Sequence, residues 1–456
     1  MGSQDNDNKL VRGLSNRHIQ FIAIGGAIGT GLFMGSGKTI NVAGPSIILV
    51  YCVIGFFMFF MLRALGELLL SNLEYKSFTD FCEDLIGPWA GFFMGWTYWF
   101  CFIVCGTADL MAIASYVHYW FPDTPLWIPA ISFALLLMSL NLVAVGIFGE
   151  LEFWFSSIKV VAILSLIGLG IFMVATGFTA PSGTVTSVSN LWEHGGFFPK
   201  GMFGFYAGFQ IAIYAFVGIE LLGTTAAETK NPEASLPRAI NTVPLRIVLF
   251  YICSLVVIMC ITPWNTIDPE TSPFVTVFDL IGIPAAAGVV NFIILTAAAS
   301  STNSGIYSTS RMLYGLSHLG VAPKVFKKLS KHHVPANALM FSCLVLLIGG
   351  MLLIFTPSIM EAFTLMTTLA SVLFIFVWSM ILYAYLKYLD KKPELHAASA
   401  FKVPGGRFTA IATLVFFFIA LVLMLLEEDT RSMLVVSPIW FIVLAIAYRA
   451  VSKRAQ

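Results

Sequence analysis

The chain has 456 residues, of which 58% are hydrophobic and only 11% are charged, and its formal net charge is +1. Charged residues make up roughly a quarter of a typical soluble domain, so this composition excludes a water-soluble protein. The near-neutral net charge also shows no excess of basic residues of the kind that nucleic-acid-binding proteins use. Most of the chain is therefore expected to lie in lipid.

Long apolar stretches predict helices that cross a membrane. About 20 apolar residues cover the hydrocarbon core, and only helices or closed barrels satisfy the backbone there. The stretches are continuous and do not alternate with polar residues, which favours helices over a barrel. Twelve spans are predicted, at residues 18–40, 44–71, 88–121, 125–146, 153–176, 203–225, 238–262, 275–302, 336–356, 360–388, 405–426 and 434–450.

The ends and loops of the chain predict its orientation. Residues 1–17 are polar and lack an apolar core, so no cleavable signal peptide is expected. With the N-terminus inside, 19 of the 25 Lys and Arg fall on inner segments, including the tail 451–456, and three fall outside. Because cytoplasmic loops retain Lys and Arg, both termini are predicted to be cytoplasmic. The loops are too short to hold a soluble domain.

The first span holds four glycines within seven residues, at positions 25, 26, 29 and 31. A glycine inside a helix costs about 1 kcal/mol relative to alanine, so this density predicts a break in the helix. The second half of a broken helix would present free N–H groups and a positive dipole end to an anion such as a carboxylate. The alternative is close packing of small residues against a neighbouring helix.

The sixth span contains Tyr214-Ala215-Phe216-Val217-Gly218-Ile219-Glu220, with a glycine and a carboxylate deep in an apolar stretch. Interruptions five helices apart are typical of two inverted five-helix repeats with a binding site between them. The repeats would be residues 18–176 and 203–388, followed by two further helices in 405–450. Glu220 is costly in lipid and therefore a functional candidate, or else it caps the N–H groups freed by the break.

Two other ionisable residues lie inside predicted spans. Lys159, in the fifth span, suits the binding and release of a proton because burial readily changes the protonation of a lysine. Alternatively, it snorkels to the inner interface. Asp109, in the third span, pairs with a substrate ammonium, carries a proton, or makes a structural hydrogen bond between helices.

Several other motifs lack the residues that a functional site of their kind requires. The run Gly35-Ser36-Gly37-Lys38-Thr39 looks like the end of a phosphate-binding loop, but Leu32 replaces the first glycine and no strand precedes it, so no nucleotide is expected. The serines of 300–304 have no paired histidine for catalysis and are expected to bond neighbouring helices or line a path. Loop 303–335 is expected to be a solvated inner loop, with lipid head-group contact as the alternative. No metal site, enzyme activity or disulfide is expected.

From about residue 12 to residue 450, the sequence resembles the amino acid permeases of the amino acid-polyamine-organocation superfamily. The resemblance is carried by residues 24–33, 43–67, 218–220 and 227–232. Residues 67–77, 95–100 and 308–313 are most similar to members that carry glycine, D-alanine and D-serine. The resemblance implies an all-α membrane protein with the leucine-transporter-like fold, in which the first and sixth helices are broken.

The resemblance also implies roles for individual residues. The substrate carboxylate would lie on the backbone of Ile28, Gly29, Thr30 and Gly31, and the ammonium would face carbonyls of Ala27, Tyr214, Ala215 and Val217. Tyr214 matches an aromatic gate, and Asp109 is a further candidate for the pocket. Lys159 matches a lysine that replaces a sodium ion in proton-coupled relatives, so Lys159 and Glu220 are the candidates for proton coupling.

The function expected from these features is proton-driven import of small neutral amino acids, including glycine, D-alanine, D-serine and possibly L-alanine, across the inner membrane of a bacterium. A permease or exchanger for larger neutral L-amino acids is the alternative within the same class. An uncoupled receptor or channel that binds amino acids is a further alternative. The expected partners are the amino acid and membrane lipid, with no cofactor other than the coupling proton.

Overall fold

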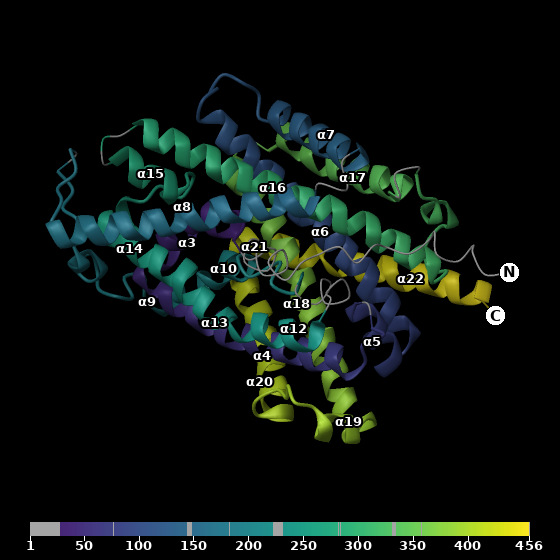
Figure 1. Ribbon diagram of the computed structural model, residues 1–456. Coiled ribbons are helices and arrows are strands. Elements are labelled where there is room, and N and C mark those ends of the chain that lie inside the picture. The colour runs from purple at the N-terminus through teal and green to yellow at the C-terminus, as the bar shows by residue number, and fades with distance from the viewer. Residues whose placement is uncertain are drawn as a thin grey trace.

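The computed structural model describes residues 28–75, 77–143, 148–181, 183–221, 231–280, 282, 284–330, 334–356 and 358–455. This part of the chain is almost entirely helical, and its β pairing is an isolated bridge between Thr179 and Val185 (Figure 1). The α-helices are α2 (Thr30–Phe33), α3 (Gly35–Ala43), α4 (Ile47–Ser71), α5 (Phe78–Leu85), α6 (Pro88–His118), α7 (Trp127–Val143), α8 (Phe148–Thr176), α9 (Gly201–Ala207), α10 (Phe209–Tyr214), α12 (Pro232–Asn241), α13 (Val243–Arg246), α14 (Cys253–Ile261), α15 (Pro273–Leu280), α16 (Pro284–His318), α17 (Ala336–Gly350), α18 (Ile359–Lys391), α19 (Pro393–Ala398), α20 (Gly406–Leu426), α21 (Glu428–Val436) and α22 (Pro438–Ala455).

The helices have the lengths and surfaces of an integral membrane protein. Within the described residues, nine helical stretches are long and apolar enough to cross a membrane. Large apolar side chains point outward from the peripheral helices, such as Phe418, which is 67% exposed, and Ile446, which is 64% exposed. Such continuous apolar faces are unfavourable in water and favourable in lipid. The predicted all-α membrane class is thus confirmed.

Each of the twelve predicted spans overlaps described helices, but the predicted end of the eighth is wrong. That helix, α16, does not end at residue 302 and continues to His318, so residues 303–318 are helix rather than loop. Polar side chains of this helix bond to backbone carbonyls one turn earlier. For example, the Thr302 hydroxyl donates to the Ala298 carbonyl at 3.1 Å. Hydroxyl groups satisfied in this way remain inside a helix, although they look like a helix end in the sequence.

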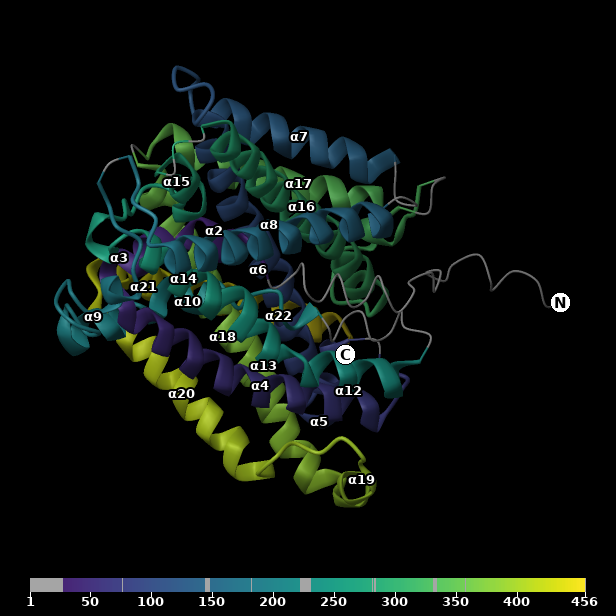
Figure 2. The same cartoon turned by 60° about the vertical axis from the view of Figure 1, so that its left-hand side comes forward.

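Helices α6, α16 and α18 run through the middle of the molecule, with α7 and α20 on opposite outer sides (Figure 2). In the most apolar stretch of α6, 83% of residues are buried, whereas only 11% are buried in the most apolar stretch of the last span, residues 428–453. Gly95 lets α6 approach α16 closely, because a Cβ there would lie 2.6 Å from Leu316 Cδ2. Small residues at such crossings are how membrane helices pack without a hydrophobic driving force.

The two ends of the helix bundle are distinct. Helices α3, α9, α15 and α21 gather at one end, and α5, α12 and α19 gather at the other (Figure 2). The described outer loops next to α15 and α21 lie at the first end, and the described inner segments around α5 and α19 lie at the second. Tyr448 of α22 packs against Phe92 near the start of α6, with ring centroids 5.3 Å apart, so the C-terminal helix ends at the α5 end.

A buried carboxylate fastens the segment 392–405, which joins α18 to α20, onto the end of α4. The side chain of Glu67 is fully buried. It accepts hydrogen bonds from His396 Nδ1 at 2.6 Å and from the Val403 N–H at 2.8 Å. One turn earlier in α4, the Arg63 guanidinium lies 3.7 Å from the centre of the Phe401 ring. A buried carboxylate needs such partners, so this segment is part of the folded body.

Two glycines of α8 provide a test of this packing. A Cβ on Gly170 would lie 2.0 Å from Val257 Cγ1 of α14, whereas a Cβ on Gly168 would meet no atom within 4 Å. Valine has one strongly preferred rotamer in a helix and cannot turn away cheaply. We therefore expect Gly170→Ala to destabilise the protein by about 1–3 kcal/mol.

The matched control is Gly168→Ala, which should leave stability unchanged or raise it by up to about 1 kcal/mol. Thermal melting of both purified variants in the same detergent measures the difference. Equal melting temperatures for the two variants would contradict the close approach of α8 and α14.

Candidate functional site

The described part of the first span begins with two non-helical residues, Ile28 and Gly29. Gly29 has extended backbone angles, φ −125° and ψ −168°, and precedes the first residue of α2, Thr30. The helical second half of the span therefore starts where the predicted break requires. Residues 24–27, including the predicted site residue Ala27, lie outside the described residues.

The start of α2 offers backbone donors beside open space. The N–H groups of Thr30 and Gly31 have no acceptor within their own helix, because the first N–H groups of a helix lack one. The next two, from Leu32 and Phe33, both donate to the Gly29 carbonyl at 3.2 Å. Among the described residues, no atom lies within 4 Å of a Cβ placed on Gly29. A small anionic group can therefore approach this backbone without a steric clash.

The sixth span breaks where the sequence predicts. Helix α10 ends at Tyr214, and residues 215–220 form turns. Gly218 has φ +94°, a conformation that glycine adopts without the penalty paid by other residues. Glu220 Oε2 accepts hydrogen bonds from the Gly218 N–H at 3.2 Å and from Trp378 Nε1 at 3.3 Å. These contacts match the capping role that was the alternative for Glu220, and they leave its predicted proton-coupling role untested.

The two breaks lie directly against each other. A Cβ on Gly31 would lie 2.8 Å from Ala215 Cα and 2.9 Å from Tyr214 Cδ1, so only glycine permits this approach. The Ala215 carbonyl accepts a hydrogen bond from the Tyr251 hydroxyl at 2.8 Å, and the Tyr214 carbonyl accepts one from the Val217 N–H at 3.0 Å. Each carbonyl keeps a second lone pair for another donor. The start of α2 and the non-helical backbone that follows α10 thus face each other inside the helix bundle.

Asp109 of α6 joins the first span to its neighbours. Its buried Oδ1 accepts a hydrogen bond from the Thr30 hydroxyl at 2.6 Å. Ser301 of α16 lies within hydrogen-bond reach of the same carboxylate, and the charge of Lys159 on α8 acts on it. The structural hydrogen bond between helices, one of the alternatives for Asp109, is therefore present. Its other predicted roles, in ammonium binding or proton transfer, stay predictions.

Lys159 is only 1% exposed, so its ammonium does not reach solvent at the inner interface. Snorkelling, the alternative for this residue, does not fit that burial. The interaction between Lys159 and Asp109 links the fifth span to the third. A buried ammonium whose charge acts on a carboxylate is a group whose protonation state matters to the surrounding helices.

Other predicted motifs take structural roles. Residues 35–39 belong to helix α3 and not to a phosphate-binding loop. In the serine-rich run, Asn303 Oδ1 accepts a hydrogen bond from Asn141 Nδ2 at 2.6 Å, which ties α16 to α7. The sequence did not point to three residues that bond a neighbouring helix or the sixth-span break, namely Asn141, Tyr251 and Trp378. Each is polar or partly polar within an apolar span, which was the available signal, but their partners are distant in sequence.

Known proteins are similar to this chain over nearly its whole length. The sequence matches the amino acid permease family over residues 18–455. It is 58% identical to the D-serine/D-alanine/glycine transporter of Escherichia coli K12, over 98% of this chain and 95% of that protein. It is 50% identical to the amino-acid permease AapA of Bacillus subtilis, over 100% and 99% of the two chains. A probable threonine/serine transporter of Bacillus subtilis is 41% identical, over 99% and 97%.

These relatives are named as transporters and permeases, not as enzymes. The similarity covers nearly the full length of each protein, so it includes both helix breaks and the helices around them. The chain therefore belongs to the amino acid permease family.

Proposed function

We propose that this protein is a secondary active transporter that imports small neutral amino acids by proton symport. The observation that carries the proposal is the contact between the two helix breaks, at Gly31 and Ala215, beside the open space at Gly29. An α-amino acid is a zwitterion whose ammonium and carboxylate are attached to the same carbon atom. A helix N-terminus and freed carbonyls, facing each other across a small space, complement those two charges.

In this proposal the carboxylate lies on the N–H groups of Ile28, Gly29, Thr30 and Gly31. The Thr30 hydroxyl already donates to Asp109, so the backbone and not this side chain binds the carboxylate. The ammonium donates to carbonyls around Tyr214, Ala215 and Val217, together with that of Ala27. Tyr214, which packs edge-on against Phe363 with ring centroids 6.0 Å apart, closes the site as a gate.

The named relatives favour a small substrate. The Escherichia coli relative is named for D-serine, D-alanine and glycine, and it shares 58% of residues with this chain. We propose the same three substrates here, with L-alanine as a further one. The protein would lie in the inner membrane of a bacterium with both termini in the cytoplasm, as the distribution of Lys and Arg predicts.

Lys159 is the proposed carrier of the coupling proton. It is buried, and its charge acts on Asp109, which in turn bonds Thr30 at the first break. A change in the protonation of Lys159 would therefore change the electrostatic environment of the residues that hold the substrate carboxylate. No cofactor is required, and a sodium ion is not needed because the lysine supplies the positive charge.

The direct test is uptake of labelled glycine, D-alanine, D-serine and bulky neutral L-amino acids into proteoliposomes without sodium. We expect the small substrates to accumulate above equilibrium only with an inward proton gradient. Accumulation of bulky L-amino acids alone would overturn the substrate assignment and leave a transporter of the alternative kind. Uptake that never exceeds equilibrium would overturn coupled transport altogether.

Lys159→Ala should separate coupling from substrate exchange. Without the ammonium, gradient-driven accumulation of glycine should fall at least about tenfold, because the proton has no carrier. Exchange of internal for external glycine should continue, which also shows that the variant is folded. Lys391→Ala, at an exposed lysine near the end of α18, is the control and should accumulate glycine normally. Normal uphill uptake by Lys159→Ala would refute the proton-carrier role.

Gly29→Val should abolish substrate binding without unfolding the protein. The new side chain points into open space, so the helices need not move, but it occupies the place of the carboxylate. Glycine should raise the melting temperature of the unchanged protein and leave that of Gly29→Val where it is. Gly315→Val is the matched control, because a Cβ there also meets no atom within 4 Å. A retained shift in Gly29→Val would place the carboxylate elsewhere.

A further inference from the structure

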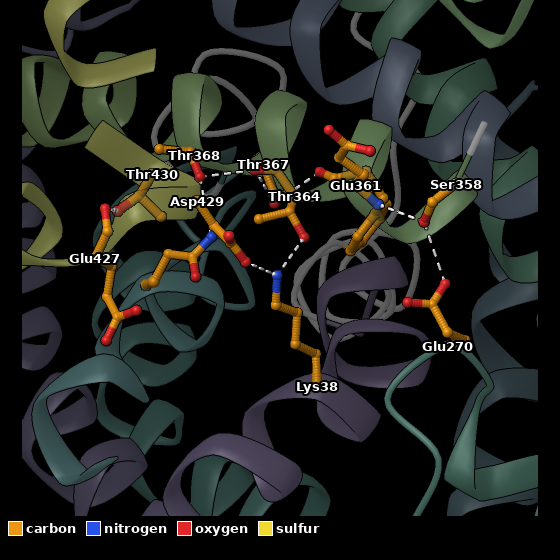
Figure 3. A network of polar contacts seen from close by, with 12 residues as sticks. Lys38, Glu270, Ser358, Glu361, Thr364, Thr367, Thr368, Glu427, Asp429 and Thr430 are labelled. Carbon is orange, nitrogen blue, oxygen red and sulfur yellow. Dashed lines mark hydrogen bonds and ion pairs between the residues drawn. The ribbon is translucent and has the colours of Figure 1, made fainter. Parts of the chain in front are cut away.

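Lys38, in the glycine-containing run that resembles a phosphate loop, links three helices. It lies on α3, the second half of the first span, and its side chain is only 17% exposed. Its Nζ donates to Asp429 Oδ2 of α21 at 2.7 Å and to the Thr364 hydroxyl of α18 at 3.2 Å (Figure 3). One ammonium therefore connects the broken first span to a helix of the second repeat and to the pair of helices added after it.

Helix α21, which carries Asp429, is held in place by its neighbours. It packs against α18 and α20. The hydroxyl of Thr430, a buried residue next to Asp429, donates to the Met424 and Glu427 carbonyls and fixes the start of α21 to the end of α20. Lys38 also acts electrostatically on the Glu427 carboxylate. The carboxylates that attract Lys38 are thus held in place by the two C-terminal helices.

On its other side, α3 is covered by the loop 267–272 that precedes α15. The Ser272 hydroxyl donates to the Phe33 carbonyl at 2.6 Å. A Cβ on Gly37 would lie 2.6 Å from the Thr271 carbonyl oxygen, so the loop backbone lies directly on the helix. Glu270 of this loop accepts a hydrogen bond from the Ser358 hydroxyl, which caps α18 (Figure 3). The predicted outer side of α3 is therefore closed over in this structure.

Beneath α3 lies α10, the helix that ends at the sixth-span break. A Cβ on Gly35 would lie 2.4 Å from Ile211 Cγ2, so α3 rests on α10 without a gap. A movement of α3 away from α10 and α18 would open this contact to solvent. Such a movement must stretch the contact of Lys38 with Asp429, because Asp429 belongs to α21 and not to α3.

We propose that Asp429 is a positioning residue for transport, which holds α3 closed through Lys38 and releases it when the predicted outer side opens. The proposal rests on the proposed transport function. It gives the C-terminal helices, which lie outside the two repeats, a part in the access of substrate to the site. Asp429 is 62% exposed, so the ion pair is weak enough to break within a transport cycle. The partial burial of Lys38 makes it strong enough to shift the population of closed and open states.

The experiment measures access to the surface that α3 covers. Ile211→Cys is introduced into the full chain, and its reaction with a membrane-impermeant maleimide is timed in right-side-out membrane vesicles without substrate or gradient. The seven native cysteines are counted as background from the chain without Ile211→Cys. We expect Asp429→Asn and Lys38→Met each to raise the labelling rate about three- to tenfold, since either variant removes the ion pair.

Exchanging the charges separates a positioning role from a general loss of structure. Lys38→Glu combined with Asp429→Lys should return the labelling rate to within about twofold of the starting value, whereas Lys38→Glu alone should raise it most. Thr364→Val, which removes only the neutral partner of Lys38, should have a smaller effect. The control is Arg407→Met, which breaks an ion pair with Asp390 that joins α20 to α18 away from α3.

Unchanged labelling in Asp429→Asn and Lys38→Met would overturn the proposal, as would equal increases in Arg407→Met. Failure of the charge exchange to restore slow labelling would overturn it as well. Labelling requires no substrate and no proton gradient, so its outcome is independent of the uptake experiment. A protein that carried no glycine and yet showed the charge-dependent labelling would refute the proposed function and leave the inference about α3 intact.

Discussion

Non-helical backbone in the middle of a membrane is tolerated only where protein surrounds it, because lipid offers no hydrogen-bond partners. This constraint governs the arrangement of the whole bundle. The two breaks, at Gly29 and at residues 215–220, lie against each other, and the central helices α6, α16 and α18 enclose them. Side chains satisfy the groups that the sixth-span break exposes: Glu220, within the break, accepts from the Gly218 N–H, and two neighbouring elements supply Tyr251, which donates to the Ala215 carbonyl, and Trp378, which donates to Glu220. Without this enclosure neither break would be stable.

The enclosure also explains why ionisable groups lie so deep in the protein. Asp109 and Lys159 would each be costly if buried alone, but the charge of the lysine acts on the carboxylate, and Thr30 donates to it. The result is a series of electrostatic and hydrogen-bond interactions from the fifth span, through the third, to the first break. A change at one end alters the partners of the next group, which is the physical requirement for coupling between an ion and a substrate.

The sequence predicts more of the fold than of the contacts. The spans follow from long apolar runs, and the breaks follow from glycine density and from a carboxylate in an apolar stretch. The end of α16 was misplaced because hydroxyl groups that bond their own helix resemble a polar loop in the sequence. The roles of Glu220 and Asp109 remained open because they depend on partners, Trp378 and Thr30, that lie 158 and 79 residues away. Sequence spacing contains no information about such distances in space.

The fastening of segment 392–405 by Glu67 has a consequence for the two C-terminal helices. They come after the two repeats and can look like an addition that a minimal chain would not need. A chain that ended after α18 would lose His396 and Val403, and with them two hydrogen bonds to the carboxylate of Glu67 at the end of α4. Each hydrogen bond to a charged group contributes about 1.5–3 kcal/mol, a large share of the stability of most proteins. The end of α4 therefore depends on residues C-terminal to α18, so the last two spans are tied to the first part of the chain and are not a detachable addition.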